Sequence, residues 1–400
     1  MRKKILFVAE AVALAHVSRP LVLARAAQQT GHDVVFATDE RDHWLLRDDT
    51  LAVRSIHSMS PQRFLGAIAR GSPLFDYATL RAGVDEDLRL IESVRPDLVI
   101  GDLRLSLSVS ARLAKVPYVA ICNAYWSPFW RDAQFDAPPL AATRLVPLRA
   151  ANALFQLVRP LAFAWHTRPL NRVRREFGLT ALPLDMRYVY TDADHVLYAD
   201  AAEMFPLRNA PSTHRFLGPV IWSPPTERPA WWHRIAQDRP IIYVTLGSTG
   251  DPRQLPAITA TLAKRSVCVM VATARRIDPG TLPSNVFSAA YLPGDAAARM
   301  AALVICNGGA PTSQQALAAG VPVLGIATNL DQVLNMQAVT RTDAGLALRG
   351  DRTSAADIDR AAGRIMNDAS FTTAAGTVAT TFARYDTTAR LGAFLSELFE

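Results

Sequence analysis

The sequence predicts an α/β protein made of two doubly wound domains, each with a parallel sheet. Apolar runs alternate with helical patterns from the start of the chain, beginning with a strand-like run at 4–9, a helical pattern at 17–31 and a second run at 33–38. Buried parallel strands read as continuous apolar runs because helices cover both faces of their sheet. After a proline-rich stretch the same alternation restarts at 241–250. The second half therefore repeats the Rossmann-like architecture of the first.

Length and composition support this division. The chain has 400 residues, half of them hydrophobic, which is enough for more than one core. We assign 1–218 to an N-terminal domain, 219–239 to a linker and 240–384 to a C-terminal domain, and we expect a helix at 385–400 that packs back toward the N-terminal domain. In such folds ligands bind beyond the carboxyl ends of strands and commonly between domains. We therefore expect the domains to face each other across a cleft.

Charge and cysteine usage narrow the class of protein. The net charge of +7 comes from basic residues spread along the chain, and we find no zinc-finger, RRM or KH signature, so nucleic-acid binding is not expected. No uncharged apolar run reaches the roughly 18 residues that a spanning helix needs. Cys122, Cys268 and Cys306 stand in apolar runs and are too few for a disulfide framework. These features favour a cytoplasmic location.

One stretch, VICNGGAPTSQQAL, runs from an apolar strand through two glycines into a helical pattern. Gly308 and Gly309 permit close approach of the backbone. Pro311 suits an early helical position, and Thr312 and Ser313 add hydroxyls, so this helix start suits a phosphate. A turn that needs glycines for geometry alone explains the stretch equally well. The stretch lacks the Walker lysine, and no G-x-G-x-x-G follows the first strand, which argues against a P-loop and a dinucleotide dehydrogenase.

Two other segments of the second half also follow apolar strands. Asp331 and Gln332 place a carboxylate beside an amide, which suits sugar hydroxyls, although taken alone they are better explained as a helix N-cap and its neighbour. The segment GSTGD at 247–251 offers backbone amides and hydroxyls to a second anionic group.

In the first half, a histidine and an aspartate follow strands. His16 is expected in the loop after strand 4–9, where a group with a pKa near neutrality suits a general base. Asp102 ends the run PDLVIGD, and an aspartate on the second ring nitrogen fixes a histidine's tautomer and stabilises the imidazolium. Each residue alone is more often structural, so the hypothesis depends on the pair.

Together these motifs resemble a nucleotide-sugar-dependent glycosyltransferase of the GT-B fold, of the bacterial UDP-glycosyltransferase type. The resemblance covers nearly the whole chain. AHVSRPLVLARAAQQTGHDVVFAT resembles the family's entry motif, in which the histidine ahead of the proline is the base, and PDLVIGD resembles the strand that carries its aspartate partner. The block from Asn307 to Gln332 matches the donor-binding signature in its long spacing.

The resemblance implies a donor-binding set that is carried over position by position. Thr312 and Ser313 fall in the phosphate region, Gln315 falls where the family contacts the ribose, and Asp331 and Gln332 fall where it holds the transferred sugar. The whole set is Gly247, Ser248, Thr249, Tyr291, Leu292, Asn307, Gly308, Gly309, Thr312, Ser313, Gln315, Asp331 and Gln332.

The chain departs from the family pattern at several of these positions. Asn307 stands where a histidine usually meets the diphosphate, and asparagine donates a hydrogen bond but carries no charge. Gln315 replaces a glutamate, which leaves UDP and dTDP donors open. In AYLPGD, Tyr291 and Gly294 replace the usual base-stacking tryptophan and its glutamine partner.

The implied reaction is inverting transfer, with His16 as the base and Asp102 as its partner. The nucleotide sugar is a co-substrate, and neither a metal nor a bound cofactor is required. The D-x-D look-alikes at 85–87 and 192–194 are interpreted as solvated faces rather than metal ligands.

The acceptor is expected in the N-terminal domain and to be lipophilic or aromatic. Tyr125, Trp126, Phe129 and Trp130 follow the strand at 117–123 and suit such a ligand, although core packing also explains some of them.

A basic and apolar segment follows these aromatic residues. Residues 144–175 hold seven arginines and no acid, as in an acceptor lid or a membrane-contacting patch. Three prolines are expected to break this segment into short pieces rather than one long helix.

Two alternatives remain open. One is a non-catalytic nucleotide-sugar-binding partner, which Asn307, Gly294 and Ala15 favour; the other is a sugar-nucleotide epimerase on the same fold. The expected partners are a nucleotide-sugar donor and a small acceptor, in a monomer or a homodimer.

Overall fold

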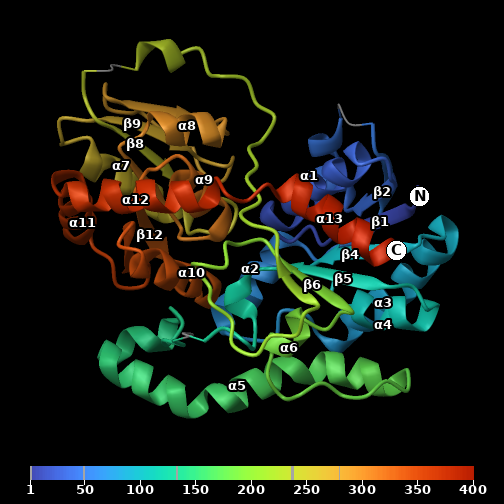
Figure 1. The fold of residues 1–400 in the computed structure, drawn as a ribbon. Coiled ribbons are helices and arrows are strands. Elements are labelled where there is room, and N and C mark those ends of the chain that lie inside the picture. The colour runs from blue at the N-terminus through green and yellow to red at the C-terminus, as the bar shows by residue number, and fades with distance from the viewer. Residues whose placement is uncertain (1, 48–49, 132–133, 236–237, 279) are drawn as a thin grey trace. The chain divides into compact units, whose positions relative to one another are not determined.

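The computed structural model describes residues 2–47, 50–131, 134–235, 238–278 and 280–400. The chain forms two compact units (Figure 1). The first unit contains residues 1–133, 156–220 and 385–400, and the second contains residues 134–155 and 221–384.

The segment 134–155 differs from the predicted division, because we assigned it to the N-terminal domain. The structure joins it to the second unit through polar contacts with the end of that unit's last strand. Nη1 of Arg349 donates to the carbonyl of Ala137 at 2.5 Å. The hydroxyl of Thr143 donates to Asp351 at 3.2 Å.

The first unit has a seven-stranded sheet in the order β3-β2-β1-β4-β5-β6-β7, and every pairing in it is parallel. The strand order reverses between β1 and β4, where Ala9 lies opposite Asp102. Ligands of such sheets bind beyond the carboxyl ends of the strands at this reversal. The strands are β1 (Lys4–Ala9), β2 (Asp33–Thr38), β3 (Ala52–Ser55), β4 (Leu98–Asp102), β5 (Tyr118–Cys122), β6 (His195–Tyr198) and β7 (His214–Phe216).

Helices cover this sheet and fill its core. The last helix packs against the first, with Leu395 fully buried, so the end of the chain belongs to the core of the first unit (Figure 1). The helices are α1 (Ala15–Gln29), α2 (Pro61–Arg70), α3 (Tyr77–Val94), α4 (Leu107–Ala114), α5 (Leu148–Glu176), α6 (Arg187–Tyr190) and α13 (Thr387–Phe399). The start of α5, up to Phe155, belongs to the second unit.

The second unit repeats the scheme with a six-stranded parallel sheet in the order β10-β9-β8-β11-β12-β13. Its reversal lies between β8 and β11, where Thr245 is opposite Cys306. The strands are β8 (Ile241–Thr245), β9 (Cys268–Ala272), β10 (Val286–Ala289), β11 (Leu303–Cys306), β12 (Val323–Ala327) and β13 (Gly345–Arg349). The helices are α7 (Leu255–Leu262), α8 (Gly294–Met300), α9 (Ala310–Ala318), α10 (Leu330–Arg341), α11 (Ala355–Asn367) and α12 (Ala369–Phe382). Short 3-10 helices in the chain cover Glu40–Leu46, Ala124–Trp126, Ala141–Leu145, Trp232–Arg234 and Pro252–Gln254.

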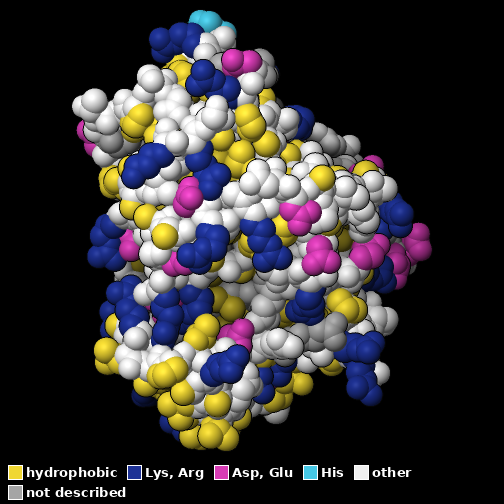
Figure 2. Space-filling model, turned by 90° about the vertical axis from the view of Figure 1, so that its left-hand side faces the viewer, with side chains coloured by type: hydrophobic (Ala, Val, Ile, Leu, Met, Phe, Trp, Pro, Cys, Tyr) yellow, Lys and Arg dark blue, Asp and Glu magenta, His cyan; other side chains and the backbone are white. Residues whose placement is uncertain are grey.

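The prediction that prolines divide residues 144–175 was wrong, because α5 is one helix of 29 residues with Pro160 and Pro169 inside it. Each proline removes one backbone hydrogen bond. Pro160 lies on the exposed side, where water can satisfy the carbonyl that loses its donor. Apolar packing on the opposite side, with Phe163 and Leu170 buried, holds the helix to the unit. Figure 2 shows hydrophobic and basic side chains gathered at the lower end of the view, where Figure 1 places α5.

No helix in the described ranges combines the length and the apolar character that crossing a membrane requires.

Candidate active site

His16 and Asp102 meet at the strand reversal of the first unit. The helix α1 begins at Ala15, so His16 lies in its first turn. The prediction that His16 lies in the loop before this helix was therefore wrong. Nδ1 of His16 is 2.8 Å from Oδ1 of the buried Asp102. An ionised carboxylate only accepts hydrogen bonds, so Nδ1 carries a proton, and in the neutral tautomer the lone pair is therefore on Nε2. This is the arrangement that a general base requires.

Arg19 is a third member of this site that the sequence analysis missed. Its Nε donates to Oδ2 of Asp102 at 2.6 Å, and its Nη2 donates to Oδ1 at 2.9 Å. The third guanidinium nitrogen, Nη1, donates to Oδ1 of Asn123 at 2.6 Å. Asn123 in turn donates to Asp200 at 3.1 Å. The sequence signal was an arginine three residues after His16 in the same helix, a spacing at which two side chains share a helix face.

The electrostatics of Asp102 follow from these neighbours. Burial opposes ionisation of its carboxyl group, but the charge of Arg19 and the hydrogen bond from His16 outweigh burial, so the pKa of Asp102 lies below its ordinary value. Asp102 is therefore ionised at neutral pH, and its position is fixed from two sides.

At the strand reversal of the second unit, Asn307 joins the loops that follow β8 and β11. Its Nδ2 donates to the hydroxyl oxygen of Thr249 at 3.0 Å, and its Oδ1 accepts from the amide of Gly309 at 3.0 Å. Both polar atoms of the side chain thus have partners in the protein. Gly308 has a φ of 78°, and a Cβ there would lie 2.7 Å from Cγ of Met336, so only glycine fits this turn.

The start of α9 offers donors to an anion. Gly309 is the N-cap residue and Pro311 lies in the first turn. In the parts of the chain that the structure describes, the backbone amides of Ala310 and Thr312 make no hydrogen bond. Ser313 differs from its predicted role, because its hydroxyl points into the helix and donates to the carbonyl of Gly309 at 3.0 Å. The groups that this helix start offers to an anion are therefore the backbone amides and the hydroxyl of Thr312.

Two glutamines predicted to bind the donor have partners inside the protein. Gln332 is buried; its Oε1 accepts from the amide of Thr328 at 2.7 Å, and its Nε2 donates to Thr249 at 3.3 Å. Gln315 donates to the carbonyl of Trp222 and, at 3.2 Å, to Ser223. These contacts shape the turns around the site, because they tie α9 and α10 to neighbouring segments.

The remaining residues of the predicted donor set lie where they were expected, after strands of the second sheet. Gly247 and Ser248 follow β8, and Asp331 lies in the first turn of α10. Tyr291 and Leu292 follow β10; Leu292 is buried, and the guanidinium of Arg275 lies 5.6 Å from the centre of the Tyr291 ring. Their contact with a donor stays a prediction.

Arg276 adds a positive charge that the sequence analysis missed. Its Nη1 donates to the carbonyl of Gly250, so the guanidinium lies against the loop after β8. Burial lowers its pKa, but an arginine remains charged at neutral pH. Because Asn307 is neutral, Arg276 is a candidate for the charge that an anionic donor needs here.

The predicted acceptor aromatics divide into two groups. Tyr125 and Trp130 are buried and pack against Phe205, with ring centres 5.7 and 5.4 Å apart, so these two belong to the core and not to a ligand surface. Trp126 and Phe129 are half-buried. Trp126 lies 5.0 Å from the ring of Tyr190.

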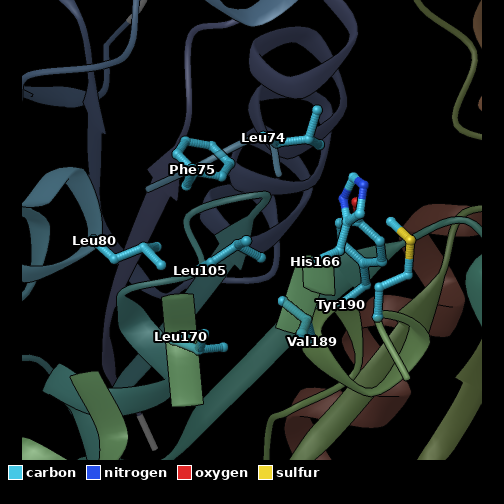
Figure 3. A pocket seen from close by; sticks show the side chains of 9 residues that line it. Leu74, Phe75, Leu80, Leu105, His166, Leu170, Val189 and Tyr190 are labelled. Atoms are coloured by element: carbon cyan, nitrogen blue, oxygen red, sulfur yellow. The ribbon is translucent and has the colours of Figure 1, made fainter. Parts of the chain in front are cut away.

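Tyr190 lines an apolar pocket of the first unit (Figure 3). The imidazole of His166 also lines it, with Nε2 3.2 Å from the carbonyl of Gly71, and burial lowers the pKa of His166, so the pocket wall is uncharged at neutral pH. Several lining residues share a core cluster with Val12, which precedes α1 and His16. The lining residues are Leu74, Phe75, Leu80, Leu105, His166, Leu170, Met186, Val189 and Tyr190.

The interpretation of the D-x-D look-alikes at 85–87 and 192–194 as solvated faces was wrong, because an aspartate of each is held by other side chains. Asp87 is fully buried and accepts from Nε of Arg104 at 2.9 Å and from the hydroxyl of Ser106 at 2.5 Å. Asp192 is ion-paired with Arg112 and Arg174. Among the described residues, no group of three or more histidine, cysteine or acidic side chains could hold a metal ion.

Comparison with known sequences identifies relatives along nearly the whole chain. A family model for the C-terminal domain of erythromycin biosynthesis protein CIII-like proteins matches residues 259–391. The chain is 46% identical over 383 residues to the "PGL/p-HBAD biosynthesis rhamnosyltransferase" of Mycobacterium bovis (strain BCG / Pasteur 1173P2), a match that covers 96% of this chain and 85% of the relative. An "Inactive PGL/p-HBAD biosynthesis glycosyltransferase" of the same strain is 45% identical over 263 residues, 66% of this chain and 72% of that protein.

Solved glycosyltransferases share the fold. SsfS6 of Streptomyces sp. SF2575, complexed with thymidine diphosphate, has a TM-score of 0.71 at 19% identity, covering 99% of this chain and 100% of that one. The spinosyn rhamnosyltransferase SpnG, complexed with spinosyn aglycone, has a TM-score of 0.70 at 18% identity and covers both chains fully. The architecture is therefore GT-B, as predicted.

The sequence identity is 46% with the mycobacterial relative but only 18% and 19% with these solved structures, so the relative identifies the family. The chain belongs to the family of the PGL/p-HBAD biosynthesis glycosyltransferases and is a glycosyltransferase.

The contacts of Asp102 lead to a stability prediction. In Arg19→Gln the buried carboxylate loses its cationic partner, and we expect the free energy of unfolding to fall by about 3–5 kcal/mol, measured by urea denaturation. Arg63→Gln is the control, because Arg63 forms an exposed pair with Asp76 at 2.6 Å, and such pairs contribute about 0–1 kcal/mol. Equal losses in the two variants would contradict the role of Arg19.

Proposed function

We propose that the protein transfers a deoxyhexose, rhamnose in the first instance, from a dTDP- or UDP-sugar to a hydroxyl of a lipophilic aromatic acceptor, with inversion at the anomeric carbon. The observation that carries the proposal is the contact of 2.8 Å between His16 and Asp102 at the strand reversal of the first unit. The choice of sugar is supported by the rhamnosyltransferase name of the relative from Mycobacterium bovis. The choice of nucleotide is supported by the thymidine diphosphate complex of a protein with the same fold.

In this proposal the first unit binds the acceptor and supplies the base. Nε2 of His16 takes the proton of the acceptor hydroxyl, and the oxygen attacks the anomeric carbon as the bond from that carbon to the diphosphate breaks. Asp102 accepts the hydrogen bond from Nδ1 and stabilises the imidazolium. Arg19 holds Asp102 in place from the other side and is a positioning residue.

The second unit binds the donor and stabilises the leaving group. The amides of Ala310 and Thr312 at the start of α9, together with the helix dipole, favour the diphosphate. The guanidinium of Arg276 supplies the positive charge that Asn307 lacks. Charge on the departing diphosphate is thus met by protein groups, and we propose a metal-independent reaction.

The apolar pocket lined by Leu74, His166 and Tyr190 is proposed as the acceptor site. Its uncharged wall suits an aromatic or alkyl group. Trp126 borders it through Tyr190, so one of the predicted acceptor residues remains in this proposal.

We also propose a cytoplasmic location, in a monomer or a homodimer. Cys122, Cys268 and Cys306 are all buried free thiols, which fits a reducing compartment.

A second candidate function is a non-catalytic partner that binds nucleotide sugars. It is favoured by the engagement of both polar atoms of Asn307 within the protein, and by the name of an inactive relative. Slow release of free sugar from the donor distinguishes the candidates, because donor hydrolysis needs a working leaving-group site.

The role of His16 is tested by His16→Ala. With dTDP-rhamnose as donor and an alkylphenol as acceptor, we expect transfer to fall by about 10²–10⁴-fold, because the general base is lost. Dissociation constants for dTDP and UDP should be unchanged. His57→Ala, at an exposed position of the same unit, is the control. Retained turnover in His16→Ala would refute the base.

The donor site is tested by thermal denaturation with UDP, dTDP and GDP. A nucleotide that binds the folded state raises the Tm. We expect UDP or dTDP to do so, and Arg276→Gln to weaken its binding by about tenfold or more, because a charge-assisted hydrogen bond is lost. Arg253→Gln removes an exposed arginine near the same loop and should leave binding intact. If Arg276→Gln binds as the native protein does, the diphosphate is held without Arg276.

A further inference from the structure

The outer face of α5 is an exposed apolar surface. On this helix Leu154, Leu157, Val158, Leu161 and Trp165 are exposed, and their spacing of three and four residues places them on one side of a helix. Leu157 is 78% exposed and Leu161 is 75% exposed, so neither contributes to the core. Apart from Leu184, all the exposed large hydrophobic residues in the described part of the chain lie between Leu145 and Trp165. A soluble protein rarely gathers such residues without a partner.

Positive charge continues the same side of the helix. Arg168, Arg172 and Arg175 follow the apolar stripe at helical spacing and are exposed. The range 144–175 contains seven arginines and no acidic residue. The acid that follows, Glu176, is bound by Arg81 at 2.6 Å and by Tyr77 at 2.5 Å. The outer face is therefore apolar in its middle and positively charged toward its end.

We propose that this face of α5 lies on the surface of an anionic lipid bilayer. An interfacial helix inserts its apolar side chains below the headgroups, while arginines at the edge bind lipid phosphates. Trp165, which is 46% exposed, is the residue type that favours the headgroup level.

A second copy of the chain fits this face poorly. In a symmetric dimer the same patch meets itself, so the arginines of two copies would approach one another with no acid from 144–175 between them. An anionic bilayer supplies the opposite charge over the whole length of the helix.

The opposite side of α5 connects this surface to the proposed acceptor pocket. His166 and Leu170 of α5 line the pocket. The ring of Trp165 packs edge-on against the ring of His166, with centres 5.6 Å apart. Trp165 on the proposed membrane face and His166 in the pocket wall are thus neighbours in one helix. Access to a membrane-borne acceptor would require such proximity. This purpose rests on the proposed function, whereas the binding to lipid does not.

The proposal is tested by co-sedimentation of the full chain with vesicles. We expect binding to phosphatidylcholine vesicles that contain phosphatidylglycerol, and little binding to phosphatidylcholine alone. Leu157→Ser/Leu161→Ser should weaken binding by about tenfold or more, because two inserted side chains are lost. Arg168→Gln/Arg175→Gln should weaken it by about fivefold for each arginine, and raised salt should act in the same direction.

Matched controls exist on the same chain. Leu184 is 60% exposed but lies outside α5, so Leu184→Ser should bind as the native protein does. Arg253→Gln/Arg360→Gln changes the net charge by the same amount at exposed positions. Both double arginine variants, the one in α5 and its control, should retain the native Tm shift with dTDP or UDP. This result would separate lipid binding from donor binding.

Three results would overturn the proposal. They are absence of sedimentation with anionic vesicles at low salt, equal binding of the α5 variants and their controls, and a native dimer that Leu157→Ser/Leu161→Ser dissociates. If lipid binding fails while the nucleotide shift persists, the membrane surface is refuted and the transferase proposal is not.

Discussion

The buried carboxylate of Asp102 is the group on which the first unit's site depends. It ends β4 at the strand reversal and receives hydrogen bonds from two residues of α1, His16 and Arg19. Burial alone would favour its neutral form, and the charge of Arg19 keeps it ionised. The ionised carboxylate then fixes which nitrogen of His16 carries the proton. Arg19, which does not contact the substrate in this account, therefore supports the base indirectly, because its charge keeps Asp102 ionised.

The second unit has the same kind of strand reversal, but the side chain that joins its loops, Asn307, is uncharged. At its reversal the side chain of Asn307 joins Thr249 to the amide of Gly309, and Gln332 makes a further contact with Thr249. These contacts set the shape of the loops around the proposed anion site and add no charge to them. In the proposed function the positive charge at this site comes instead from Arg276, which lies in the loop after β9 and donates to the carbonyl of Gly250. Shape and charge are thus supplied by different residues, whereas a histidine at position 307 would supply both.

The sequence predicted what depends on local pattern and long spacing. Continuous apolar runs gave the two parallel sheets, and the GT-B assignment is confirmed by solved neighbours. The structure brings His16 and Asp102 together because parallel strands align their carboxyl ends. Arg19 and Arg276 were missed because their partners, Asp102 and Gly250, come from other elements, and no pattern of residue types marks such contacts.

Burial was the other property that the sequence left undetermined. The four aromatics after β5 look alike in sequence, but packing against Phe205 takes Tyr125 and Trp130 into the core. The helix α5 also contradicted the rule that a proline ends or breaks a helix. Tertiary packing of Phe163 and Leu170 outweighs the two hydrogen bonds that its prolines remove.

The most direct test of the central claim is the protonation state of the His16 ring in the intact protein. We would record proton–nitrogen correlation spectra of protein labelled with ¹⁵N-histidine, and assign His16 from the signal lost in His16→Gln. The account predicts that the neutral form of the ring carries its proton on Nδ1, with a downfield Nδ1 proton resonance that is lost in Asp102→Asn. A proton on Nε2 instead, or a spectrum that Asp102→Asn leaves unchanged, would contradict it.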